Sequence, residues 1–177
     1  FFINSNADAA VKAGVISAGM RDLAEDQLNI PFADAHQNGW ASASDMMMLD
    51  LVNASITQGW KRPVYFACTV SDDMYAEFAP YLQLTGMAYQ ITPLRTQNYG
   101  DEIVANTDKM YKNVTTKFRW GGLDTPEGRA GKIYLDETVR RMVNTTRTMM
   151  ITLANSLADE ATAAQDAKKD GKTTIYG

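Results

Sequence analysis

Apolar side chains recur every three or four residues in the stretch that follows Ser42, which is the spacing of one face of a helix. These side chains are Met48, Leu49, Val52 and Ile56. Ser42 and Asp45, three residues apart, form the pattern of a capping box at a helix N-terminus. Gly59 suits the left-handed residue that ends a helix. The pattern therefore predicts a capped amphipathic helix between Ser42 and Gly59.

Two short runs rich in β-forming residues follow this helix, at Val64–Cys68 and at Met87–Thr92. The first run is apolar throughout, which is typical of a central strand that is buried on both faces. The second run alternates apolar and polar positions, as a half-buried strand does. Because Ser71 is expected to cap a helix between the two runs, their order predicts a right-handed βαβ unit with parallel strands. An entirely helical fold, with the two runs as buried connectors, is the alternative.

Helical spacing of apolar residues returns at Asp101–Phe118, and again from Val139 for about seven turns. Ile133–Leu135, between these two helices, is an apolar, strand-like patch. The fold class that we predict is α+β, mainly helical, with a small parallel sheet and a long C-terminal helix. We expect a core domain over residues 1–135 and a helical arm with its tail over residues 136–177.

The first half of this C-terminal helix carries a methionine-rich stripe, whereas its second half is rich in alanine. The stripe consists of Met142, Val143, Met149 and Met150. A helix of this length reaches about 40 Å, beyond the roughly 30 Å span of a compact domain of this size. We therefore expect the first half to pack on the domain and the second half to dock on a further helix or a neighbouring chain.

Composition narrows the classes of function. The chain has 177 residues, a net charge of −4 and no evident basic patch, so we expect no nucleic-acid partner. Cys68 is the only cysteine and His36 the only histidine, so paired zinc-ligand spacings are absent and we expect no metal and no cofactor. No apolar run approaches the roughly 20 residues that span a bilayer. Since the chain begins without methionine, we interpret it as part of a longer protein.

No residue is predicted to be catalytic, because His36 lacks the Gly-x-Ser-x-Gly elbow that would accompany a nucleophilic serine. The candidates for ligand binding are Asp50, Trp60, Arg62, Tyr65 and Trp120. The aromatic rings could stack on sugars, and Arg62 could bind a carboxylate or phosphate. The alternative interpretation is structural, with the rings in the core and Asp50 paired with Arg62 across the Gly59 turn.

Five blocks of the chain resemble, in the same order, the soluble region of a known membrane protein family. The blocks are residues 45–50, 60–67, 81–93, 117–121 and 134–137. The family consists of large bacterial GT-C-type, protein O-mannosyltransferase-like membrane glycosyltransferases, and the similarity covers roughly positions 1 to 160. The chain departs from the family pattern at Thr85, where an acidic residue is expected, and at Gln90, where a basic one is.

The resemblance implies a non-catalytic, extracytoplasmic or periplasmic accessory domain of a membrane-embedded glycosyltransferase-like protein. It also implies that the catalytic acid lies outside this chain, and that a tetratricopeptide-like helical region continues the long helix. The expected partners are the transmembrane part of the same protein and a protein or glycan acceptor. Two alternatives remain open, a protein-interaction module on a helical-repeat scaffold and a small hydrolase. The hydrolase would use paired carboxylates drawn from Asp45, Asp50, Asp72 and Asp73.

Overall fold

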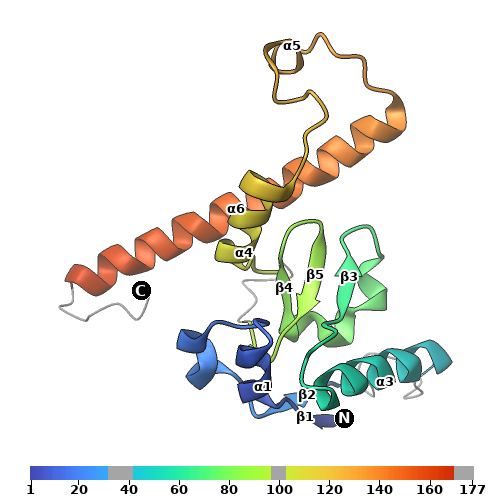
Figure 1. Cartoon of the computed structure of the whole chain (residues 1–177), viewed down its shortest axis with the longest axis vertical. Coiled ribbons are helices and arrows are strands. Elements are labelled where there is room, and N and C mark those ends of the chain that lie inside the picture. Colours follow the sequence, from blue (N-terminus) through green and yellow to red (C-terminus); the bar gives the residue numbers. More distant parts are fainter. Residues whose placement is uncertain (32–41, 97–102, 170–177) are drawn as a thin grey trace.

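The computed structural model of the chain describes residues 1–31, 42–96 and 103–169. Its elements form three tiers in Figure 1, with the N-terminal elements and α3 at the base, a small sheet in the middle and α6 across the top. His36 lies outside the described residues. None of the described helices combines the length and the hydrophobicity that crossing a bilayer requires.

The base of the molecule holds a two-stranded antiparallel sheet, in which Phe2 lies opposite Asn29. Its elements are β1 (Phe2–Asn4), α1 (Ala7–Lys12), the 3-10 helix η1 (Ala18–Leu23), β2 (Gln27–Asn29) and α3 (Ala43–Thr57). α3 is the capped helix that the sequence predicts. The Ser42 hydroxyl accepts a hydrogen bond from the Asp45 amide, and the Asp45 carboxylate accepts one from the Ser42 amide. The capping box is therefore confirmed, and Gly59 adopts the expected positive φ of 70°.

The apolar face of α3 builds the core between the base and the sheet. Leu49, Val52 and Ile56 are buried, in one cluster with side chains from the base and the sheet. Trp60 closes this cluster, and its indole N–H donates to the Ser5 carbonyl oxygen at 2.8 Å. A buried tryptophan needs such a partner for its polar edge. The core therefore ties α3 and the turn that follows it to the N-terminal segment.

The middle tier is a three-stranded antiparallel sheet in the order β3-β5-β4. Its elements, with two 3-10 helices, are β3 (Tyr65–Ala67), η2 (Asp72–Met74), η3 (Ala76–Tyr81), β4 (Leu82–Leu84) and β5 (Ala88–Ile91). The predicted parallel sheet is wrong. A parallel connection needs a crossover of a dozen or more residues, usually an α-helix, whereas Pro80 limits this segment to 3-10 turns that end at Tyr81. Residues Leu82–Leu84, which follow these turns, then pair with β5 as a β-hairpin.

The inserted β4 also changes which strand is central. β5 lies between the other two strands, and β3 is an edge strand whose Tyr65 and Ala67 are exposed. The prediction that Val64–Cys68 forms a central strand buried on both faces is therefore wrong. Phe66, which points inward between them, packs against Phe78 with ring centroids 5.8 Å apart. One face of this run is buried, and the other face carries the exposed Tyr65. By composition alone, such a run resembles a strand that is buried on both faces.

The upper tier is helical. Its elements are α4 (Thr107–Lys112), the π-helical turn η4 (Asn113–Lys117), α5 (Pro126–Arg129) and α6 (Glu137–Lys169). Residues 101 and 102 of the helix predicted over Asp101–Phe118 lie outside the described residues. The helix begins at Thr107, because residues 104–106 run beside β4, where the Leu84 amide donates to the Val104 carbonyl oxygen. The strand-like patch at Ile133–Leu135 is not a strand.

The long C-terminal helix is confirmed as α6, with 33 residues and a length of about 50 Å. Leu153 is the one buried residue among the described side chains of α6, and it packs with Leu84, Ala105 and Met110. Met149 packs against the same cluster, whereas the side chain of Met142 is 64% exposed. The helix is thus anchored at its middle, and the expectation that its first half is covered by the domain is wrong for Met142.

Candidate functional site: an apolar groove beneath the C-terminal helix

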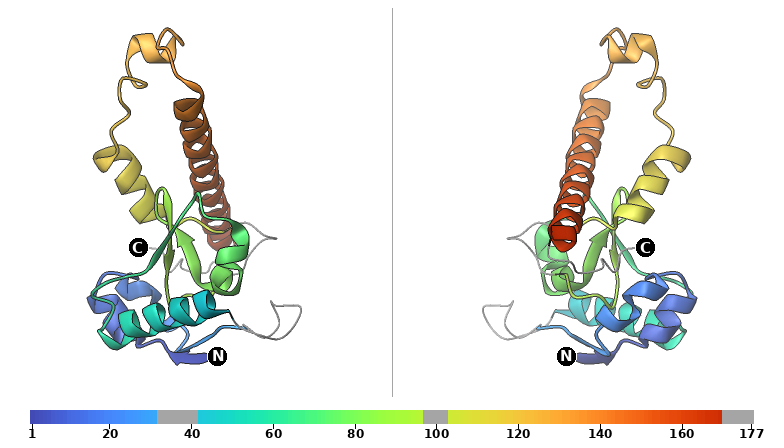
Figure 2. Two further views of the ribbon diagram at one scale, coloured as in Figure 1. Left: turned by 90° about the vertical axis from the view of Figure 1, so that its right-hand side faces the viewer. Right: turned by 90° about the vertical axis from the view of Figure 1, so that its left-hand side faces the viewer.

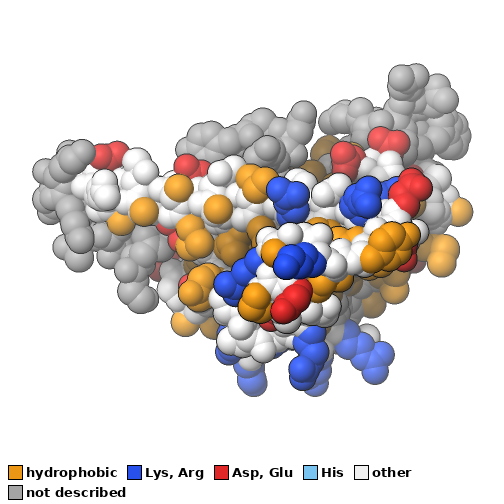
Figure 3. Space-filling view, turned by 90° about the horizontal axis from the view of Figure 1, so that it is seen from above, with side chains coloured by type: hydrophobic (Ala, Val, Ile, Leu, Met, Phe, Trp, Pro, Cys, Tyr) orange, Lys and Arg blue, Asp and Glu red, His pale blue; other side chains and the backbone are white. Residues whose placement is uncertain are grey.

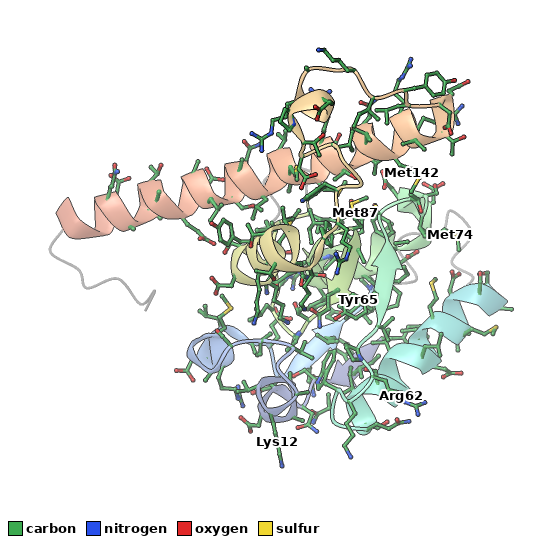
Figure 4. All side chains as sticks on the ribbon, turned by 45° about the horizontal axis from the view of Figure 1, so that its top comes forward. Lys12, Arg62, Tyr65, Met74, Met87 and Met142 are labelled. Carbon is green, nitrogen blue, oxygen red and sulfur yellow. The ribbon has the colours of Figure 1, made fainter. Side chains whose placement is uncertain are left out.

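The five residues that the sequence singles out do not form one site. Trp60 is buried in the core, and its backbone has a positive φ of 59°. Asp50 is exposed on α3, and Tyr65 is 49% exposed on the edge strand β3. Arg62 and Tyr65 lie well below the upper tier in Figure 4, whereas Trp120 belongs to that tier. Only Trp120 lines the groove described below.

Asp50 and Arg62 do not form the predicted ion pair, since no such contact occurs among the described residues and both side chains are exposed. The turn is held instead through the backbone. The Ser55 hydroxyl donates to the Arg62 carbonyl oxygen at 2.7 Å, and the Trp60 amide donates to the Ser55 carbonyl oxygen at 2.8 Å. Ser55 therefore performs the structural role that was predicted for the ion pair.

The acidic residues considered for hydrolysis have separate structural roles. The Asp45 carboxylate caps α3, and the Asp72 carboxylate accepts a hydrogen bond from the Tyr75 hydroxyl. Asp50 projects from the outer side of α3. No group of three potential metal ligands occurs within residues 1–31, 42–96 and 103–169.

A groove of about 890 Å³ lies between the first half of α6 and the segment that follows α4. It is lined from the β4–β5 turn by Met87, from the segment by Lys117, Phe118, Arg119, Trp120, Leu123, Asp124 and Arg129, and from α6 by Val139, Met142, Val143, Thr146, Arg147 and Met150. Figure 4 labels Met87 in this turn and Met142 on α6. Figure 2 shows α4 and α6 as two arms above the sheet, joined at the top by the segment that carries α5.

Close packing of glycines shapes the wall opposite α6. A Cβ atom on Gly86, in the β4–β5 turn, would lie 3.1 Å from the Phe118 ring, so this ring is packed directly over the turn. Phe118 also contacts Trp120 edge to face, with ring centroids 5.8 Å apart. Farther along, a Cβ on Gly128 would lie 2.4 Å from the Gly122 carbonyl oxygen, so the α5 turn is folded tightly onto the segment before it. The groove wall is therefore closely packed at both Gly86 and Gly128.

Positive charge surrounds the apolar lining of the groove. The side chains of Lys117, Arg119, Arg129 and Arg147 are exposed, and none of them forms an ion pair within the described part of the chain. The one acidic residue of the lining is Asp124. Figure 3, which views the molecule from above, shows hydrophobic side chains interleaved with Lys and Arg side chains on the upper face. The groove can therefore receive a group that is apolar on one side and negatively charged on the other.

A second cavity, of about 530 Å³, lies between the 3-10 helices and α6 and contains Asp72, Tyr75 and Tyr89. The Tyr75 ring packs against Tyr89, with centroids 5.4 Å apart. Burial, and then the hydrogen bond to Asp72, raise the pKa of the Tyr75 hydroxyl above its usual value of 10.0. A tyrosine held neutral in this way is a hydrogen-bond donor rather than a base. Tyr75 therefore supplies ring packing and a hydrogen bond in this cavity and does not abstract a proton.

The half-buried Lys109 of α4 connects the upper tier to the base and the sheet. Its ammonium group donates to the Val15 carbonyl oxygen at 2.6 Å and to the Gln90 side-chain oxygen at 3.2 Å. Burial lowers the pKa of this ammonium group. Because both acceptors are neutral, these two hydrogen bonds support a structural role for Lys109 but supply no opposite charge to offset its burial.

Sequence reasoning identified Trp120 but missed the rest of the groove. The available signal was the alternation of cations and aromatic rings in residues 117–120, next to a helix whose first half carries methionines. These two segments are far apart in the sequence, with α5 and its flanking loops between them. No pattern of neighbouring residues indicates that they face each other.

A comparison with protein families finds one match, in which the model of TMEM260-associated domain 2 covers residues 1–111. The matched part contains the base, the sheet and nearly all of α4, whereas most of the groove lining follows it. No curated protein and no solved structure matches the chain.

Proposed function

Because the chain belongs to the TMEM260-associated domain 2 family, we propose that it is a non-catalytic accessory domain of a membrane protein. The family match over residues 1–111 is the observation that carries this proposal. The description of the family names a domain that accompanies TMEM260. In this proposal the domain acts together with the membrane-embedded part of the protein.

The finer proposal concerns the activity of that body. TMEM260 is a protein O-mannosyltransferase, and five blocks of this chain resemble the soluble region of GT-C-type glycosyltransferases. Both similarities support a parent protein that transfers a sugar, with the domain on its extracytoplasmic side and the reaction centre elsewhere. In this proposal the groove contacts either the transmembrane body or the acceptor.

The test uses the full-length protein that contains this domain, reconstituted in membranes, with sugar transfer to an acceptor as the measurement. Deleting the domain should lower transfer, whereas the isolated domain should transfer no sugar. Met142→Asp, which introduces a charge into the groove lining, should lower transfer in the same direction as the deletion. Met47→Asp on α3 is the matched control, because Met47 is 66% exposed and Met142 64%. Unchanged transfer after deletion would contradict the proposal.

A protein-interaction module is the second candidate, and the groove favours it specifically, because its four cations have no ion-pair partner among the residues that the structure describes. The two candidates differ in whether the partner belongs to the same polypeptide. The third alternative, a hydrolase with paired carboxylates, has no geometric support, because Asp45 and Asp72 have hydrogen-bonding roles on separate elements.

A further inference from the structure

We propose that the groove beneath α6 binds an acidic amphipathic helix of a protein partner. This inference rests on the proposed function in one respect, namely that the groove is the interaction surface of the domain. It adds the chemistry and the secondary structure of the occupant. The argument uses the shape of the groove, its apolar lining and its charge.

The shape of the groove fits a rod. One wall is the first half of α6, the opposite wall is the segment from Lys117 to Arg129, and Met87 from the β4–β5 turn also lines the groove. The volume of about 890 Å³ accommodates the inward face of about three turns of an α-helix, whose diameter with side chains is about 10 Å. A groove of this kind between structural elements is the usual receptor for the apolar face of a helix.

The lining selects an apolar face. Phe118, Trp120 and Leu123 from one wall are half-buried, as are Val143 and Met150 from α6, whereas Met142 is 64% exposed. Apolar surface gathered in one place on a protein marks an interaction site more often than scattered apolar residues do. The methionines at positions 87, 142 and 150 have flexible, polarizable side chains that adapt to different apolar partners. Covering Met142 is therefore the main gain that an occupant obtains from α6.

The charge selects an acidic partner. Residues 117–147 contain seven Lys and Arg against four Asp and Glu, although the whole chain has a net charge of −4. The four cations in the lining lack an ion-pair partner within the described residues. Arginine binds carboxylates through two parallel hydrogen bonds, and complementary charge determines which partner binds. Carboxylates that flank the apolar stripe of a bound helix would reach Arg119 on one side and Arg147 on the other.

The concave form of this surface favours a helix over a bilayer. A flat anionic membrane would contact the outer edges of the two walls, whereas a helix can lie between them. A peptide strand would be expected at a free sheet edge. In this sheet that edge is β3, and none of its residues Tyr65–Ala67 lines the groove. The acidic helix is therefore the occupant that contacts both walls and their cations.

The test measures binding of fluorescein-labelled peptides to the domain by fluorescence anisotropy. The probes are an array of helical peptides of about four turns, with Leu, Ile, Met or Phe on one face and Glu or Asp elsewhere. Matched peptides carry Lys in place of Glu, and vesicles of phosphatidylserine and phosphatidylcholine test the membrane alternative. At least one acidic peptide should bind with a Kd below about 100 μM, and added salt should weaken this binding.

Variants then locate the binding surface. Met142→Asp and Arg147→Glu should each weaken binding of the acidic peptide by about tenfold or more. Met47→Asp and Arg62→Glu, at exposed positions of the base, are the matched controls and should leave the Kd unchanged. The proposal is overturned by any of three results. These are no acidic peptide binding below about 100 μM, equal binding of the Lys peptides, and vesicle binding that depends on Met142 in the absence of peptide binding.

Failure of this experiment is distinguishable from failure of the proposed function. If no helix binds but deletion of the domain still lowers sugar transfer by the full-length protein, the accessory role stands and the occupant is wrong. If deletion has no effect while acidic helices bind at the groove, the binding surface stands and the link to the glycosyltransferase is wrong.

Discussion

The indole nitrogen of Trp60 donates a hydrogen bond to the carbonyl oxygen of Ser5, 55 residues earlier in the chain, at 2.8 Å. Both residues are buried, so this bond joins the turn after α3 to the N-terminal segment inside the core. Trp60 also occupies a left-handed backbone conformation, which is unusual for a large side chain. The packing of its ring, this hydrogen bond and the bond from the Trp60 amide to the Ser55 carbonyl oxygen together hold that conformation.

Trp60→Phe should destabilise the protein by about 1–3 kcal/mol, because it removes the donor and leaves the buried Ser5 carbonyl oxygen without this partner. The measurement is equilibrium unfolding in urea. Trp120→Phe is the matched control, since Trp120 is half-buried in the groove wall, and it should cost less than about 1 kcal/mol. Equal losses in both variants would contradict the assignment of a specific role to the Trp60 N–H group.

Gly86→Ala should destabilise the protein by about 1 kcal/mol or more, because residue 86 has a φ of 150° and the new Cβ would lie 3.1 Å from the Phe118 ring. Since Phe118 lines the groove, peptide binding there should weaken as well. Thermal unfolding and fluorescence anisotropy provide the two measurements. Gly19→Ala is the control, because no atom lies within 4 Å of its Cβ position and its φ is not positive. Retained stability in Gly86→Ala would show that the turn adapts without strain.

Leu153→Ala should cost about 2 kcal/mol and loosen α6, because Leu153 is the buried contact of this helix with Leu84 and Met110. Hydrogen exchange should show the loss of amide protection around residues 149–160, where α6 meets the domain. Leu157→Ala, at a position that is 39% exposed, should change stability by less than about 0.5 kcal/mol. If the two alanine variants behave alike, α6 is held by contacts other than this cluster.

Lys109 makes the stability of the protein depend on pH in a defined direction. Burial lowers the pKa of its ammonium group in the folded state below the usual 10.5. Between these two pKa values the unfolded chain binds more protons than the folded one, so the contribution of Lys109 to the free energy of unfolding rises with pH in that interval. Below the folded-state pKa, the full cost of burying the charge is present.

The measurement compares urea unfolding of the wild type and of Lys109→Met from neutral pH to about pH 10.5. The stability of the wild type relative to the variant should increase as the pH rises. Lys112→Met, which replaces an exposed lysine of α4, is the control and should show a difference from the wild type that varies less with pH. A difference between the wild type and Lys109→Met that stays constant would show that the Lys109 pKa is not lowered.

The sequence by itself determined the elements that depend on neighbouring residues. The α3 capping box is formed by two residues three positions apart, and the length of α6 follows from a helical period that no proline interrupts. These features follow from local hydrogen bonds and side-chain spacing, which a sequence records directly. The family model of TMEM260-associated domain 2 matches residues 1–111, within the roughly 160 residues over which the sequence resembles GT-C-type glycosyltransferases, and the glycosyltransferase link itself stays a proposal.

The tertiary structure decided the direction of the strands and the place of the groove. Pro80 limits the connection to 3-10 turns, and whether the following Leu82–Leu84 extends the turns or forms a strand depends on pairing with β5. The groove arises because Leu153 anchors the middle of α6 and leaves Met142 facing the wall that contains Phe118. Contacts between residues far apart in the chain carry no local periodicity, so sequence patterns alone could not have brought them together.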